Sequence, residues 1–183
     1  MIRVTCAIIR NEENELLVVR RGGNSDHPFK WEFPGGKVNE GETEEECIIR
    51  EIREELSIDI VICKRMAEVA YDYGKKQILL IPFVCDTLDE LPLLSEHIAF
   101  KWIPRKELLN IDYSEADLIV ADNYLKADIG HDADYPENSG TGQDTTVDGE
   151  LMAMVNSTLR LALQAAKAKH LANILLVRNT IDV

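Results

Sequence analysis

Residues 36–58 read GKVNEGETEEECIIREIREELSI and contain the most informative pattern of the sequence. Its second part predicts a helix over residues 43–56, because it is rich in good helix formers and its apolar residues recur on one side: Cys47, Ile48, Ile52 and Leu56. Glu51, Glu54 and Glu55 share one face of that helix, since residues three and four apart are neighbours on a helix.

Three carboxylates on one helical face repel one another and weaken the helix, so a compensating cation is one interpretation of the cluster. Carboxylate oxygens suit hard divalent ions such as Mg²⁺ or Mn²⁺, which bridge to substrate phosphates. The alternative is a solvated charged face, because glutamate is a good surface helix former.

Composition narrows the function classes. The chain has 183 residues and a formal net charge of −13, which disfavours a nucleic-acid polymer as partner. No apolar run approaches the roughly 20 residues of a membrane-spanning helix, and the first residues do not resemble a secretory signal. The four cysteines show no C-x-x-C pair. We therefore expect a cytoplasmic protein with reduced thiols, which binds neither membrane nor nucleic acid.

The distribution of polar residues predicts three parts: a main domain at 1–126, an acidic flexible linker at 127–149, and a helical C-terminal extension at 150–183. The linker is turn-rich and without periodicity. In the extension, apolar residues recur at helical spacing and predict a helix over about 150–171: Leu151, Val155, Leu159, Ala162 and Ala166. Its apolar stripe could pack on the domain or pair two copies into a homodimer, and we recognise no chemistry in it.

Strands and helices are interleaved around the acidic helix, which predicts a mixed α+β sheet rather than the regular repeat of a doubly wound fold. The expected strands and short helices follow from β-rich runs, turn signals and helix-start signals. The strands are 4–10 and 15–21 as a hairpin, 31–33, 58–71 and 76–86 around a turn at 72–74, and 98–103; the helices are 104–109 and 115–125.

The pattern Gly36-x5-Glu42-x7-Arg50-Glu51-Ile52-x-Glu54-Glu55-x-Ser57-Ile58 resembles the Nudix box, the loop–helix–loop signature of hydrolases that cleave nucleoside diphosphates linked to another moiety. It departs from the box only at Ser57, where the family usually has glycine. The preceding Trp31-Glu32-Phe33-Pro34-Gly35-Gly36-Lys37 is similar to the MutT-like branch, which acts on nucleoside triphosphates. The resemblance covers about residues 1–126.

The resemblance implies a Nudix-type α/β/α sandwich with a helical extension and a divalent-metal site, Mg²⁺ or Mn²⁺. It makes the Gly35 carbonyl, Glu54 and Glu55 metal ligands, and makes Glu51 a further ligand or the base that activates water. Arg50 and Glu42 would orient these carboxylates. At Ser57 a positive φ would cost about 1 kcal/mol, which affects the end of the helix but not the ligand set.

Four further residues are candidates for catalysis or substrate binding. By resemblance, Arg21 would bind phosphate and Glu96 would be a metal-binding or catalytic carboxylate; the alternatives are a solvent-exposed arginine and an ordinary loop acid. Asp117 matches a residue that reads the base in relatives, although it could instead cap a helix. Trp31 could flank the base or pack in the core.

The function implied is hydrolysis of (d)NTPs, 8-oxo-dGTP or CTP-like, to a nucleoside monophosphate and pyrophosphate, as sanitation of oxidised or non-canonical nucleotides in the service of DNA repair. ADP-ribose or a nucleotide sugar is an alternative, disfavoured because Tyr73 stands where ADP-ribose branches have proline. A non-catalytic nucleotide-sensing module is the second alternative, and the intact glutamates disfavour it.

Overall fold

The computed structural model describes residues 1–87 and 91–127, of which Met1–Ala127 form one compact unit. The predicted linker, from residue 128 on, and the C-terminal helix with its homodimer interface lie outside the described residues. Within those residues, no helix has the length and apolar character needed to cross a bilayer.

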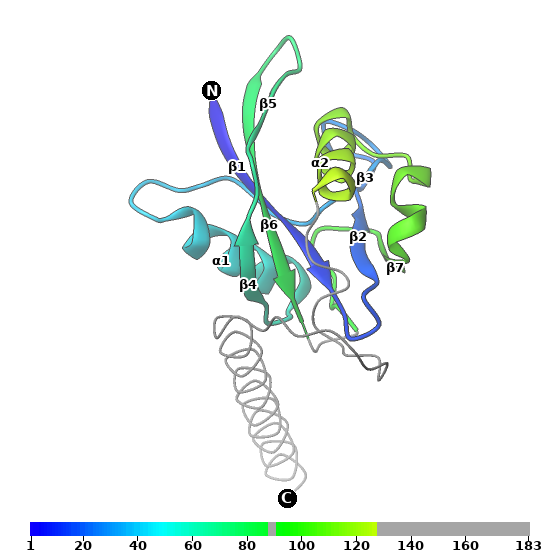
Figure 1. The fold of residues 1–183 in the computed structure, drawn as a ribbon. Helices are drawn as coiled ribbons and strands as arrows, with labels where there is room; N and C mark the ends of the chain where they lie inside the picture. Colours follow the sequence, from blue (N-terminus) through cyan, green and yellow to red (C-terminus); the bar gives the residue numbers. More distant parts are fainter. Residues whose placement is uncertain (88–90, 128–183) are drawn as a thin grey trace, which may run out of the picture. The chain divides into compact units, whose positions relative to one another are not determined.

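A single mixed sheet forms the centre of the unit (Figure 1). Its strands run in the order β3-β2-β1-β6-β4, and β5 also pairs with β6 while β7 pairs with β2. The central pair β1 and β6 is parallel and every other pair is antiparallel. The bounds are β1 Ile2–Arg10, β2 Leu16–Arg20, β3 Trp31–Glu32, α1 Glu44–Leu56, β4 Val61–Arg65, β5 Val69–Asp72, β6 Gln77–Asp86, β7 Ala99–Ile103, a 3₁₀ helix Arg105–Asn110 and α2 Glu115–Lys126.

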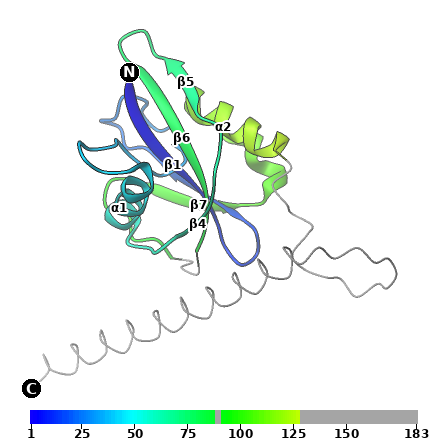
Figure 2. The same cartoon turned by 60° about the vertical axis from the view of Figure 1, so that its left-hand side comes forward.

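The central strands are buried on both faces. On β1, Ala7 and Ile9 pack in one cluster with the apolar side of α1: Ile48, Ile52 and Leu56. The alternate residues Cys6 and Ile8 are equally buried and point to the opposite face. Figure 2 shows α1 and α2 on opposite sides of β1 and β6. The predicted α/β/α sandwich is therefore confirmed, with each fully buried isoleucine or leucine contributing roughly 2 kcal/mol relative to exposure.

The ends of α1 are fixed by local chemistry. At its start, the Thr43 hydroxyl accepts the Glu46 N–H at 3.1 Å and the Glu46 carboxylate accepts the Thr43 N–H at 2.8 Å, which is a capping box. At its end, Ser57 has φ 56° and ψ 32°, in the left-handed region, and its N–H donates to the Arg53 carbonyl. The chain therefore keeps the positive φ of the usual glycine at a cost of about 1 kcal/mol.

One expected strand is wrong in extent. Residues 58–71 form two short strands, β4 and β5, which pair separately with different parts of β6. Between them, the Met66 N–H donates to the Pro82 carbonyl at 2.9 Å, so the chain stays close to β6 while it breaks its register. The pairing partners, rather than the β-rich composition, set these limits.

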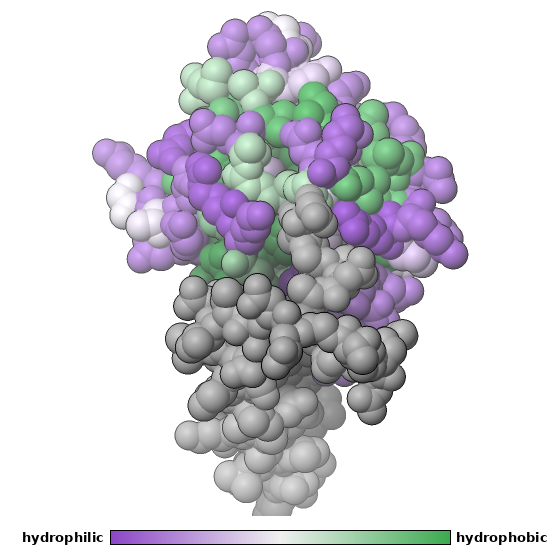
Figure 3. Space-filling view, in the orientation of Figure 1, coloured by the Kyte–Doolittle hydropathy of each residue, from purple (hydrophilic) through white to green (hydrophobic). Residues whose placement is uncertain are grey.

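The surface in the orientation of Figure 1 is mostly hydrophilic, with smaller hydrophobic areas between the charged side chains (Figure 3). Among the exposed large apolar side chains, Leu109 lies on the 3₁₀ helix, and Leu118 and Ile119 lie on α2. Scattered exposure of this kind is normal for a protein surface.

Candidate active site

The turn before α1 lies directly against β1. The Thr5 N–H donates to the Gly36 carbonyl at 2.8 Å, and the Ala7 N–H donates to the Pro34 carbonyl at 2.9 Å. A Cβ on Gly35, where φ is 151°, would lie 2.2 Å from the Thr5 carbonyl oxygen. A Cβ on Gly36 would lie 2.2 Å from the carboxyl carbon of Glu51. Both glycines are therefore required for the close approach of backbone to strand and to carboxylate.

Glu55 is the buried carboxylate of α1. Its residue is 7% exposed, and its Oε2 accepts the Gly35 N–H at 3.3 Å. Burial, together with the negative charges of Glu32, Glu51 and Glu96, raises the pKa of this carboxyl to about 8. The Glu55 carboxyl is therefore a buried group surrounded by other acidic side chains.

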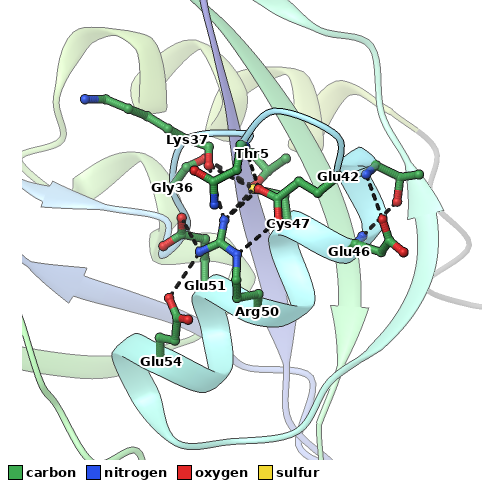
Figure 4. A network of polar contacts seen from close by, with 11 residues as sticks. Thr5, Gly36, Lys37, Glu42, Glu46, Cys47, Arg50, Glu51 and Glu54 are labelled. Atoms are coloured by element: carbon green, nitrogen blue, oxygen red, sulfur yellow. Dashed lines mark hydrogen bonds and ion pairs between the residues drawn. The ribbon is translucent and has the colours of Figure 1, made fainter.

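Arg50 binds the other carboxylates of the helix. Its Nη1 is 2.9 Å from Glu51 Oε1 and 3.1 Å from Glu54 Oε2, while its Nε and Nη2 donate to Glu42 at 3.0 and 2.7 Å. Figure 4 shows Arg50 at the centre of this network, with Glu51 and Glu54 on one side and Glu42 on the other. The hydrogen bonds from Arg50 hold the pKa of Glu42 down at about 2. Arg50 therefore contacts all three of these carboxylates at once.

The three glutamates do not form a ready-made metal cluster. Within residues 1–87 and 91–127, no three histidine, cysteine, aspartate or glutamate side chains are grouped so that they could hold an ion as they stand. The chemistry of the donors nevertheless fits a divalent cation, because Glu55 carries a raised pKa beside three like charges. A divalent ion held by these carboxylates would relieve that repulsion.

Two predicted residues from other segments reach the same region. Arg21 Nη1 is 3.0 Å from Glu32 Oε2, so the expected phosphate-binding arginine is held by a carboxylate of β3. Glu96 is exposed in the loop between β6 and β7, and its charge acts on Glu55. That loop is attached to the end of α1, where the Ser95 N–H donates to the Glu55 carbonyl at 3.0 Å.

Asp117 lies in the first turn of α2 and is 6% exposed. Its Oδ1 accepts the Phe33 N–H at 3.0 Å, and its Oδ2 accepts the Ser114 hydroxyl. Burial raises the pKa of this carboxyl to about 7, and the charge of Glu32 contributes. The Asp117 carboxyl thus accepts hydrogen bonds from the residue that follows β3 and from a hydroxyl at the start of α2.

Trp31 is buried at 9% exposure in β3. Lys101 Nζ lies 4.7 Å from the centroid of its ring, and the Arg20 guanidinium lies 5.9 Å from it. Its backbone binds the segment before α2, since the Trp31 N–H donates to the Asp112 carbonyl and the Ser114 N–H donates to the Trp31 carbonyl. A base that stacked on this ring would have to share it with these cations.

A family model described as "NUDIX domain" matches residues 1–123. The chain belongs to the NUDIX family. The Nudix relatives include an 8-oxo-dGTP diphosphatase of Escherichia coli (strain K12), 29% identical over 116 residues, which are 63% of this chain and 90% of the relative. They also include a CTP pyrophosphohydrolase of the same strain, 28% identical over 134 residues, which are 73% of this chain and 98% of the relative.

Among solved structures, a MutT protein from Methanosarcina mazei Go1 superposes with a TM-score of 0.63 at 30% identity, over 68% of this chain and 93% of that chain. The expectation of a Nudix hydrolase of MutT-like fold is therefore confirmed.

Two residues of the Nudix site were not selected from the sequence. Glu32 lies 3.0 Å from Arg21 and raises the pKa of both Glu55 and Asp117. His97, which follows Glu96 in the sequence, lies 3.0 Å from Glu32. One signal was available: a glutamate in a short strand beside a glycine turn is an unusual polar residue in a buried segment.

Proposed function

We propose that this Nudix hydrolase is a nucleoside triphosphate pyrophosphohydrolase, which depends on Mg²⁺ or Mn²⁺ and cleaves oxidised or other non-canonical (d)NTPs to a nucleoside monophosphate and pyrophosphate. Its chief support is the environment of Glu55, a buried carboxylate with a raised pKa between a glycine turn and three like charges. The names of the relatives, 8-oxo-dGTP diphosphatase and CTP pyrophosphohydrolase, support a triphosphate as substrate.

In this proposal the Gly35 carbonyl and the carboxylates of Glu51, Glu54 and Glu55 hold the cation. A cation held there would neutralise charge on the polyphosphate and lower the pKa of a water molecule, so that a base could take its proton as it attacks. The chain's own contribution is to align these carboxylates through Arg50 and to provide a base for the water, either Glu51 or Glu96.

Substrate recognition is assigned to the side of the site nearer β3 and α2. Arg21 binds phosphate, since a guanidinium already held by a carboxylate loses little freedom on binding a second anion. Asp117 reads the edge of the base, because a carboxyl with a pKa of about 7 can accept or donate a hydrogen bond near neutral pH. In the same proposal, the Trp31 ring flanks the base.

The site's place in the cell belongs to the same proposal. Hydrolysis of damaged triphosphates removes them before a polymerase can use them, which is a DNA-repair function in the cytoplasm. Cys6, Cys47, Cys63 and Cys85 are all free thiols, and this supports a reducing compartment.

The decisive experiment incubates the purified protein with Mg²⁺ and a panel containing 8-oxo-dGTP, the ordinary (d)NTPs, ADP-ribose and a nucleotide sugar. Release of pyrophosphate and a monophosphate from a triphosphate is the expected result. Cleavage confined to ADP-ribose or the nucleotide sugar would show that nucleoside triphosphates are not the substrate class. Ligand-induced thermal stabilisation without any cleavage would instead indicate a non-catalytic nucleotide sensor.

A substitution of Asp117 tests the proposed recognition of the base. We expect Asp117→Ala to raise KM for the preferred nucleotide about tenfold, equivalent to ~1.4 kcal/mol, while KM for other bases changes little. The matched control is Asp122→Ala on the same helix, where the carboxylate pairs with Lys126 at the surface. An equal rise in KM for every nucleotide would remove Asp117 from base recognition.

A further inference from the structure

His97 makes a buried contact across the site. It follows Glu96 directly in the loop between β6 and β7, and its side chain is 6% exposed. Its Nε2 lies 3.0 Å from Oε1 of Glu32, while Oε2 of Glu32 lies 3.0 Å from Nη1 of Arg21. One carboxylate therefore joins the loop that carries Glu96 to the arginine assigned to phosphate.

The direction of this hydrogen bond follows from its partners. Two acceptors 3.0 Å apart would repel each other, so the imidazole must carry a proton on Nε2 and donate it to the Glu32 carboxylate. The other ring nitrogen, Nδ1, is buried and has no hydrogen-bond partner among the residues that the structure describes. The contact with Glu32 is thus the polar interaction that orients the ring.

The loop is attached on both sides of the pair Glu96–His97. Before it, the Ser95 hydroxyl donates to the Glu54 carbonyl at 2.9 Å, and this fixes the loop to the end of α1. After it, the Ile98 N–H donates to the Arg20 carbonyl at 3.0 Å, and this fixes the loop to β2. The His97 side chain adds a third attachment, to β3, directly beside exposed Glu96.

We propose that His97 is a positioning residue, which through its hydrogen bond to Glu32 holds the Glu96 loop and the Arg21 side chain in one arrangement. The proposal rests on the proposed function, because it needs Glu96 to serve the reaction and Arg21 to bind phosphate. Glu32 is the shared partner: without it, both the loop and the arginine lose an anchor. Without His97, the Arg21–Glu32 ion pair remains and the loop loses one of its three attachments.

This difference between the two residues predicts a split between kcat and KM. His97→Asn lowers kcat about tenfold with KM within about twofold, because its shorter amide cannot reach Glu32. His97→Gln, whose amide N–H reaches close to the position of Nε2, restores most of kcat. Glu32→Ala lowers kcat and also raises KM, and Glu107→Ala, an exposed glutamate of the 3₁₀ helix, changes neither.

The double variant is the sharpest test. In the Glu32→Ala background, His97→Asn should lower kcat no further, because His97 acts through Glu32. A full additional tenfold loss there, or a His97→Asn enzyme with the kcat of the wild type, would overturn the proposal. Thermal melts of each variant check that the kinetic constants compare folded proteins.

A spectroscopic measurement tests the contact without turnover. Long-range ¹H–¹⁵N correlation of the wild-type protein, with the His97 signals identified by their loss in His97→Asn, should show a proton on Nε2. Those signals should shift in Glu32→Ala and stay unchanged in Glu107→Ala. Unchanged signals in Glu32→Ala would overturn the proposal even if the enzyme is active. A wild-type protein that cleaves no nucleotide would overturn the proposed function first, and the role of His97 with it.

Discussion

Glu55 on α1 and Asp117 on α2 are both buried carboxylates, one on each side of the sheet, and burial is the largest cause of the raised pKa of each. Glu32 acts on both. Their partners differ. Glu55 accepts one backbone N–H and lies near three glutamates. Asp117 accepts a backbone N–H and a hydroxyl, and the positive charge of Arg21 lowers its pKa.

The difference separates two chemical roles. Glu55 is buried beside three like charges that raise its pKa, so this carboxylate suits a divalent cation. Asp117 is hydrogen-bonded by the protein and needs no ion, so it suits recognition of a neutral group such as a base edge. Both assignments can be tested with the isosteric variants Glu55→Gln and Asp117→Asn, since the amide keeps the shape of the side chain and removes its charge.

The largest expected effect is on turnover. Glu55→Gln should lower kcat at least about 10³-fold, or ~4 kcal/mol, because the amide cannot neutralise or ligate a cation as the carboxylate does. Asp117→Asn should leave kcat within about tenfold of the wild type. Pyrophosphate release under saturating nucleotide measures both. Near-normal turnover by Glu55→Gln would refute its role as a ligand.

The second effect concerns the cation itself. EDTA should abolish turnover, and Mg²⁺ at about ten times its Kd should stabilise the wild-type protein by about 1.4 kcal/mol. We expect this stabilisation to be lost in Glu55→Gln and retained in Asp117→Asn. Thermal melts with Mg²⁺ and with NaCl of equal ionic strength measure it. Equal Mg²⁺ stabilisation in both variants would remove the distinction between the two carboxylates.

The third effect is on the pH dependence of stability. The pKa of Asp117 is raised from 3.8 to about 7, so between these values the folded state holds a proton that the unfolded state has lost. The free energy of unfolding contributed by this group therefore falls as pH rises from about 4 to about 7 and levels off above. Asp117→Asn does not titrate.

Denaturant unfolding of the wild type and of Asp117→Asn at several pH values measures this effect. The variant should gain stability relative to the wild type as pH rises through that window. Parallel pH profiles for the two proteins would show that the pKa of Asp117 in the folded protein stays near its ordinary value of 3.8, contrary to its buried environment.

The smallest effect tests the helix that presents Glu55. Ser57→Gly should raise the free energy of unfolding by at most about 1 kcal/mol, because glycine adopts the left-handed conformation of residue 57 without steric cost but loses more entropy on folding. Thermal or denaturant unfolding measures the change. A loss of stability would mean that the Ser57 side chain contributes an interaction that outweighs its backbone strain.

The sequence by itself determined the parts that depend on neighbours along the chain. The helix at 43–56, the glutamates on one face and the glycine turn are local features, since helix periodicity acts over three or four residues. The Nudix box is read from the same short range. In the structure α1 begins at Glu44, one residue later than predicted, and ends at Leu56 as predicted.

Tertiary structure decided the features that depend on distant segments. Glu54 and Glu55 are adjacent and chemically identical, yet the first is 62% exposed beside Arg50 and the second is buried against Gly35. The link from Arg21 through Glu32 to His97 joins three separate segments. The division of residues 58–71 into β4 and β5 likewise depends on pairing with β6. Burial and cross-strand contacts are set only when the chain folds, and they give two identical side chains different surroundings.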